Sequence, residues 1–363
     1  MLGYSGFSSS WSTVRLDFLN DYGLFLAKTV TLLIALIILL VVLVGVGHKQ
    51  RRVERGHIEV RSLNDAIESV SFTLKDAVLN PEALKQDVKN EKKRAKALQK
   101  SQKQAAKTGE DTKQRVFVID FEGDVQASAV DQLREEVTAI LSIATPADEV
   151  VVRLESPGGM VHSYGLAASQ LSRIVSKDIP LTVAVDKVAA SGGYMMACIG
   201  THIIAAPFAL LGSIGVVAQI PNFHRLLKSK DVDVEILTAG EHKRTLTMFG
   251  ENTEKGRQKF LEELEDVHVL FKEFIAENRP VVNIADVATG EAWYGKRALE
   301  HKLVDELKTS DEYIVDKCQA ADVFQVKYVE DRNRVEKLVE RFTAALTRMK
   351  GAEALRNHEP FRF

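Results

Sequence analysis

Apolar runs of strand length alternate with helix-forming segments through the middle of this 363-residue chain. The runs typical of strands are RVFVIDFEG, EVVVRLES, LTVAVD, HIIAAP and VDVEIL, at residues 115–123, 149–156, 181–186, 202–207 and 232–237. Helix-forming residues fill segments 130–141, 166–176 and 191–200, and a long amphipathic helix is predicted over 253–278. Because strands separated by helices form βαβ units, the sequence predicts an α/β protein with a mainly parallel sheet.

Charge is distributed unevenly along the chain. Residues 1–114 carry 18 Lys and Arg against 12 Asp and Glu, whereas residues 115–363 carry 30 against 38. An acidic body argues against nucleic acid as a partner. The two cysteines, Cys198 and Cys318, do not make a disulfide framework.

One stretch near the N-terminus is apolar and free of charge. Thr29 to Gly47 contains 19 residues, which as a helix would extend about 29 Å, the thickness of a hydrocarbon core. The run is too long for an ordinary signal peptide, so it predicts one transmembrane helix. Four Lys and Arg follow it in HKQRRVER, and the positive-inside rule then favours a cytoplasmic body.

A basic neck follows the apolar stretch. Residues 89–107 contain eight Lys and Arg and a single acidic residue. Such a segment cannot bury a face, so it is expected to be a solvated helix or a disordered tether, and it could contact anionic lipid. The apolar stretch 194–220 is instead interpreted as a buried helix and strand, because it is broken by Pro207 and contains polar residues.

Two glycine-containing loops each follow a predicted strand and open a helix. They are ESPGGMV, with Gly158 and Gly159, and DKVAASGG, with Ser191 and Gly192. Ligands of parallel sheets collect at the carboxyl ends of the strands, where such loops meet. Ser191, flanked by small residues, is therefore a candidate nucleophile that a substrate could approach closely.

A serine hydroxyl needs a base to become a nucleophile. His202, His224 and His242 are the nearest histidines downstream, and none has a clear Asp partner in the sequence. Lys243 follows the last predicted strand and is the other candidate. A free lysine is protonated at neutral pH, so it must be desolvated to act as a base. Ser213 could hold it in place.

Five motifs resemble the signal peptide peptidase A family of serine proteases, in the same order and at similar spacing. They are ESPGG, DKVAASGGYMMA, APFALLGSIGVV, TAGEHKR and GEAWYGKRALEHKLVDEL, which together span most of residues 115–310. The apolar stretch and basic neck resemble the SohB branch. The resemblance implies a crotonase/Clp protease-like fold of repeated ββα units, with no metal or cofactor.

The resemblance also implies a site. Ser191 would be the nucleophile, Lys243 the general base and Ser213 the residue that orients the lysine. The backbone N–H groups of Gly158 and Gly192 would form an oxyanion hole, with Gly159 in the same loop. Members with one copy of the motif set complete the dyad between neighbouring subunits. A homo-oligomer acting on small peptides, such as cleaved signal peptides, is therefore expected.

The resemblance divides the chain into five parts. These are an N-terminal segment (1–28), a transmembrane helix (29–47), a basic juxtamembrane region with linker (48–114), a protease domain (115–310) and a helical extension (311–363). The expected location is the bacterial inner membrane, although family members usually place the catalytic domain on the outer side of that membrane.

A Clp-type Ser-His-Asp site is rejected because no histidine lies near Val216. An inactive membrane scaffold with the same fold stays open as an alternative.

Overall fold

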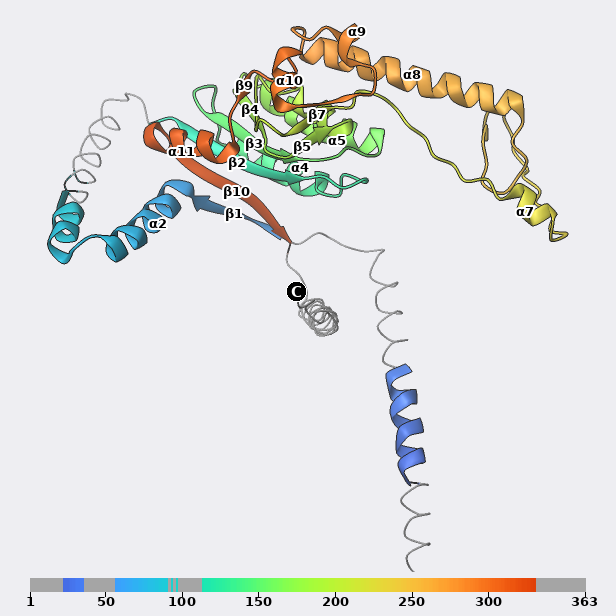
Figure 1. Ribbon diagram of the computed structural model, residues 1–363, viewed down its shortest axis with the longest axis horizontal. Coiled ribbons are helices and arrows are strands. Elements are labelled where there is room, and N and C mark those ends of the chain that lie inside the picture. The colour runs from blue at the N-terminus through green and yellow to red at the C-terminus, as the bar shows by residue number, and fades with distance from the viewer. Residues whose placement is uncertain (1–21, 36–55, 91–92, 94–95, 97–112, 331–363) are drawn as a thin grey trace, which may run out of the picture. The chain divides into compact units, whose positions relative to one another are not determined.

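A computed structural model describes residues 22–35, 56–90, 93, 96 and 113–330 (Figure 1). The chain divides into two compact units, residues 57–329 and residues 1–56 with 330–363. No helix in the described ranges is long and apolar enough to cross a membrane. Residues 22–35 are helical with exposed side chains. The remainder of the predicted span, 36–47, lies outside the described residues, as do residues 331–363 of the expected helical extension.

A seven-stranded sheet organises the larger unit. Its strand order is β1-β10-β2-β3-β4-β6-β9, and the strands from β10 to β9 are parallel. The strands are β1 (Gly56–Ser62), β2 (Arg115–Glu122), β3 (Glu149–Glu155), β4 (Leu181–Val185), β6 (His202–Ala205), β9 (Glu306–Leu307) and β10 (Asp322–Glu330). The prediction of a mainly parallel α/β sheet is confirmed, and the sheet also takes in β1 and β10, which lie outside residues 115–310.

Helices pack on both faces of this sheet. Alternate residues of β2 separate into two hydrophobic clusters, with Ile119 and Phe121 on one side and Val116 and Val118 on the other. The first cluster includes α4 (Val130–Leu141), α5 (Val161–Val175) and α6 (Gly192–Ala197), and the second includes α11 (Ser310–Ala320), beside α2 (Leu63–Val78). Because both faces are covered, the central strands are apolar along their length.

A second, smaller sheet lies beside the first. It contains β5 (Val188–Ala190), β7 (Leu210–Gly212) and β8 (Ala292–Tyr294), in the order β5-β7-β8. β4 of the large sheet leads to β5 and then α6, and β6 leads to β7. Each of these strand pairs therefore adds one strand to each sheet, and β4-β5-α6 has the expected ββα pattern.

A long segment connects β7 to the next long helix. Residues 216–253, here called the arm, include α7 (His224–Lys228) and lead into α8 (Glu254–Asn278), which lies over 253–278 as predicted. Figure 1 shows α7 and the first turns of α8 standing away from the sheets. The prediction of a strand over 232–237 is wrong, because these residues have no ladder partner. The chain then continues through α9 (Ile284–Val287) and α10 (Gly295–Glu300).

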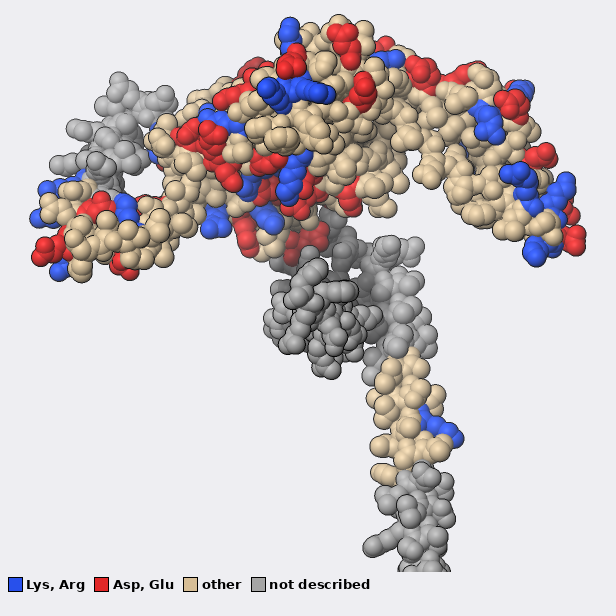
Figure 2. Space-filling model, viewed as in Figure 1, with Lys and Arg blue, Asp and Glu red and all other residues tan. Residues whose placement is uncertain are grey.

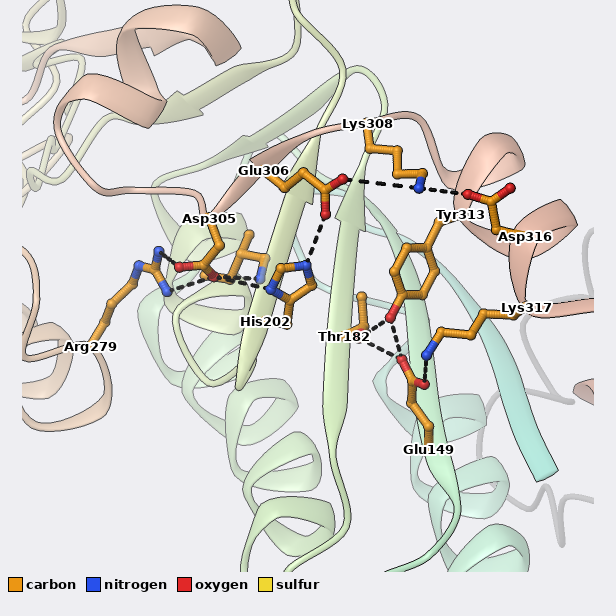
Figure 3. A network of polar contacts seen from close by, with 11 residues as sticks. Glu149, Thr182, His202, Arg279, Asp305, Glu306, Lys308, Tyr313, Asp316 and Lys317 are labelled. Carbon is orange, nitrogen blue, oxygen red and sulfur yellow. Dashed lines mark hydrogen bonds and ion pairs between the residues drawn. The ribbon is translucent and has the colours of Figure 1, made fainter. Parts of the chain in front are cut away.

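The amino ends of β3, β4 and β6 carry a network of polar contacts (Figure 3). The buried Glu149 carboxylate accepts hydrogen bonds from Thr182 and Tyr313, at 2.7 and 2.6 Å, and pairs with Lys317. These contacts fasten α11 to the sheet. A buried carboxylate is tolerated only when such donors satisfy it, so the network is structural.

Candidate active site

Ser191 occupies the turn between β5 and α6. Its backbone has φ 52° and ψ −118°, in a region that residues with a Cβ rarely adopt. The Ser191 N–H donates to the Gly212 carbonyl at 2.7 Å, and the side chain is half-buried. Strain of this kind costs on the order of 1–3 kcal/mol and persists where the surrounding structure enforces it, often at functional sites.

Ser213 lies beside Ser191. In the parallel ladder of β5 and β7, Ala190 pairs with Gly212, so that the two serines follow at adjacent positions. Ser213 also has a positive φ, of 51°, and its N–H donates to the Glu291 carbonyl at 2.7 Å. The small sheet therefore brings together two of the three residues predicted to act in catalysis.

The glycine loop after β3 abuts the Ser191 turn. A Cβ placed on Gly158, where φ is +88°, would lie 2.7 Å from the Ala190 carbonyl oxygen and 2.8 Å from Ser191 Cβ. A Cβ on Gly159 would overlap the backbone of Val125. The expected closeness of these two loops is confirmed, and only glycine fits this approach.

The N–H groups of the two loops differ in their partners. The Gly158 N–H donates to Ser156 Oγ at 3.1 Å. Across the described part of the chain, neither the Gly159 nor the Gly192 N–H has an acceptor. Unpaired N–H groups beside a serine hydroxyl are what an oxyanion hole requires.

The sequence reasoning did not identify two buried residues beneath these loops. Ser156 Oγ and Tyr164 Oη lie 2.6 Å apart, and both residues are fully buried. The Tyr164 hydroxyl donates to the Asp124 carbonyl at 2.7 Å. Ser156 belongs to the ESPGG motif, which was a signal, but nothing in the sequence marked Tyr164, because its contacts arise from tertiary packing.

Lys243 lies in the arm and not beside Ser191. Its side chain is exposed, and within the described ranges it forms no hydrogen bond with Ser191 or Ser213. Nearby, Glu241 pairs with Lys255 at 2.7 Å, which places this part of the arm beside the first turns of α8. The buried residues of α8 begin at Phe271, about 24 Å further along the helix axis. A single chain therefore keeps the two predicted dyad residues apart.

The three histidines considered as alternative bases lie elsewhere. His202 lies between Asp305 and Glu306, at 3.8 and 3.4 Å (Figure 3). His224 begins α7 and His242 lies beside Glu241, both in the arm. None of the three contacts Ser191 in the part of the chain that the structure describes.

Two family models match this chain. The description "Peptidase family S49 N-terminal" matches residues 17–171, and "Peptidase family S49" matches residues 173–324. A Haemophilus influenzae protein named "Probable protease SohB" is 51% identical over 326 residues, covering 88% of this chain and 92% of its own. The protein of the same name from Buchnera aphidicola subsp. Schlechtendalia chinensis is 47% identical over 305 residues, covering 83% of this chain and 99% of its own.

A solved structure of the 1510-N membrane-bound stomatin-specific protease is also similar. It shares 15% identity, at a TM-score of 0.40, over 57% of this chain and 86% of that chain. The two SohB proteins decide the family, because each aligns with most of this chain and most of its own length at about 50% sequence identity. The chain belongs to peptidase family S49, in its SohB branch.

Proposed function

We propose that this protein is a membrane-anchored serine endopeptidase that hydrolyses small peptides, such as cleaved signal peptides, with a Ser–Lys dyad. The observation that carries the proposal is the strained turn at Ser191, which abuts the Gly158 loop. A structural serine would not need a positive φ beside unpaired backbone N–H groups. Membership of family S49 supports peptide-bond hydrolysis as the reaction.

The reaction proceeds in two stages. Ser191 Oγ attacks the scissile carbonyl while the neutral Lys243 amine takes its proton. The carbonyl oxygen of the substrate becomes an oxyanion. It accepts hydrogen bonds from backbone N–H groups of Gly192 and the Gly158–Gly159 loop. Lys243 then gives its proton to the leaving amine, which departs and leaves an acyl-enzyme. Water, deprotonated by Lys243, hydrolyses the ester and restores Ser191. Ser213 accepts a hydrogen bond from Lys243 and holds it in place.

Lys243 is proposed to come from a neighbouring subunit. The arm that carries it exposes many large apolar side chains, namely Val217, Phe223, Leu226, Val232, Leu237 and Phe249. Figure 2 shows uncharged surface on the side of the arm toward the sheets, and charged residues around α7. Single chains rarely expose such patches, whereas interfaces use them. A homo-oligomer would cover these residues.

The proposed anchor is a single transmembrane helix over Thr29–Gly47 in the bacterial inner membrane. The basic neck after it would contact anionic lipid. The charges that flank the helix favour a cytoplasmic catalytic domain, whereas the family resemblance favours the periplasm. A reporter that is active on only one side of the membrane, fused to the C-terminus, distinguishes the two.

The competing function is an inactive membrane scaffold, which is favoured only by the separation of Ser191 and Lys243 within one chain. The test is cleavage of a casein-like or signal-peptide substrate by full-length protein purified in detergent. We expect the wild type to cleave and Ser191→Ala to lose nearly all activity. If the wild type is assembled but cleaves nothing, the inactive scaffold becomes the favoured function. If the Ser191→Ala variant still cleaves, Ser191 is not the nucleophile.

A further inference from the structure

Two buried hydroxyl groups connect the loops around Ser191. The Tyr164 hydroxyl has one proton, and that proton is donated to the Asp124 carbonyl at 2.7 Å. In the 2.6 Å contact with Tyr164, Ser156 must therefore be the donor. Ser156 Oγ in turn accepts the Gly158 N–H at 3.1 Å. The hydrogen bonds consequently run in one direction, from Gly158 through Ser156 and Tyr164 to Asp124.

This chain of hydrogen bonds joins the loop after β2 to the segment that runs from the end of β3 into α5. Asp124 lies after β2, Gly158 lies after β3 and Tyr164 belongs to α5. The Asp124 carboxylate accepts from the Ser128 N–H and hydroxyl, both at 2.8 Å, which fixes that loop in turn. Burial raises the pKa of Tyr164, so that the phenol keeps its proton throughout the working pH range.

The same two residues also lie against the glycines that follow Ser191, Tyr164 through its ring and Ser156 through its backbone carbonyl. A Cβ on Gly192 would overlap the ring of Tyr164, and a Cβ on Gly193 would lie 2.5 Å from the Ser156 carbonyl oxygen. The Gly158 loop and the start of α6 therefore rest on one buried pair. No other described side chain reaches the Gly158 N–H.

We propose that Ser156 and Tyr164 are positioning residues for the peptidase reaction. By holding the Gly158 N–H inward, they fix the loop in the conformation that leaves the Gly159 N–H free, together with that of Gly192, to stabilise the oxyanion. Neither side chain touches the substrate. The inference rests on the proposed function, because it assigns a role in that reaction.

The expected effect is on the transition state and not on substrate binding. Donors to an oxyanion act only when its charge develops, so their misplacement lowers kcat and leaves KM nearly unchanged. Direct loss of one such donor lowers kcat by about 10²–10³-fold. Misplacement by Tyr164→Phe or Ser156→Ala is expected to lower it by roughly tenfold or more, with KM within about twofold.

A matched control lies close by. Tyr194, in α6, is also fully buried, and its hydroxyl donates to the Leu303 carbonyl at 3.0 Å, but it contacts neither Ser156 nor Gly158 by a hydrogen bond. Tyr194→Phe removes one buried hydrogen bond, whereas Tyr164→Phe removes two, those to Asp124 and Ser156. If the role of Tyr164 were only structural, Tyr164→Phe would lose stability but would keep a kcat similar to that of Tyr194→Phe.

The experiment measures kcat and KM for peptide cleavage by the full chain in detergent, in the wild type, Tyr164→Phe, Ser156→Ala and Tyr194→Phe. The affinity of each for a peptide aldehyde is measured as well, because its adduct with Ser191 places an oxygen where the oxyanion forms. The inference predicts lower kcat and weaker aldehyde binding in Tyr164→Phe and Ser156→Ala alone. Far-UV circular dichroism reports folding, and Ser156→Ala provides the test if Tyr164→Phe does not fold.

Two outcomes overturn the inference and leave the proposed function intact. One is a kcat for Tyr164→Phe and Ser156→Ala within about twofold of that for Tyr194→Phe. The other is a rise in KM at constant kcat, which would assign the pair to substrate binding. A wild type that does not cleave, or a Ser191→Ala variant that does, would instead reject the proposed function itself.

Discussion

Ser191 and Gly212 are joined by a hydrogen bond of 2.7 Å between the N–H of the first and the carbonyl of the second. This bond continues the β5–β7 ladder by one residue and holds Ser191 beside Ser213. It also stabilises a backbone conformation that the serine would otherwise avoid. The orientation of the proposed nucleophile is therefore set by the small sheet.

The strain at Ser191 predicts a difference between two inactive variants. Glycine accepts φ 52° and ψ −118° without cost, whereas alanine keeps the clash of its Cβ. We expect Ser191→Gly to unfold with a free energy about 1–2 kcal/mol higher than Ser191→Ala, with no peptidase activity in either. Urea denaturation followed by circular dichroism measures this. Equal stabilities would mean that the turn carries no strain.

The Gly158 loop predicts a contrast between two glycines. Gly158→Ala would bring a Cβ to 2.7 Å from the Ala190 carbonyl oxygen at φ +88°, so the loop must move and activity should fall at least tenfold. Gly165, within α5, has no atom within 4 Å of a Cβ, so Gly165→Ala should stabilise the helix by up to about 1 kcal/mol and keep full activity. Cleavage assays and thermal melts compare them. Full activity of Gly158→Ala would contradict the proposed role of the loop.

The apolar arm predicts an effect on assembly. Leu237 is 90% exposed in the single chain, so Leu237→Asp should leave folding unchanged but weaken the proposed oligomer and its activity. Ile143, 57% exposed after α4, gives the control Ile143→Asp. Sedimentation of the detergent-purified proteins measures subunit number. An arm variant that stays fully assembled and active would show that Leu237 lies outside the interface.

Glu136 predicts a pH dependence of stability that is unrelated to catalysis. Burial raises its pKa from 4.5 to about 7, although the Tyr328 N–H donates to it at 2.8 Å. A carboxyl whose pKa is raised on folding stabilises the folded chain below pH 4.5, and that contribution is lost as pH rises toward 7. The loss is up to about 3 kcal/mol.

Glu136→Gln keeps an acceptor for Tyr328 but cannot ionise. The free energy of unfolding of this variant should vary less than that of the wild type between pH 4.5 and 7, and should exceed it at pH 8. Urea denaturation across this range measures both. Parallel pH profiles for the two proteins would show that folding does not raise the pKa of Glu136.

Sequence patterns predicted the elements that burial alone decides. The apolar runs of β3 and β4 indicated central strands, and the glycine loops after β3 and before α6 were expected to meet because parallel strands end at one edge. Residues 232–237 alternate like a strand but find no partner, and pairing cannot be read from alternation alone. The three-residue strands of the small sheet are too short to show a period.

The candidate site likewise has residues that sequence motifs predicted and residues that they did not. Ser191, Ser213 and Gly158 were predicted from motifs, and the structure brings them together through the β5–β7 ladder and the close approach of the loop. The support from Ser156 and Tyr164 depends on the hydrogen bond from Tyr164 to Asp124 in a separate loop, which local patterns do not contain. The position of Lys243 depends on the arm, whose contacts a single chain does not complete.

The most direct test of the shared dyad mixes two inactive proteins. Ser191→Ala and Lys243→Ala chains, distinguishably tagged, are combined in equal amounts under conditions that exchange subunits, and peptide cleavage is measured beside each variant alone. If the dyad forms between subunits, roughly a quarter of the sites regain both residues, and the mixture should recover about that share of wild-type activity. Mixed oligomers that are confirmed by tag capture and remain inactive would contradict the account.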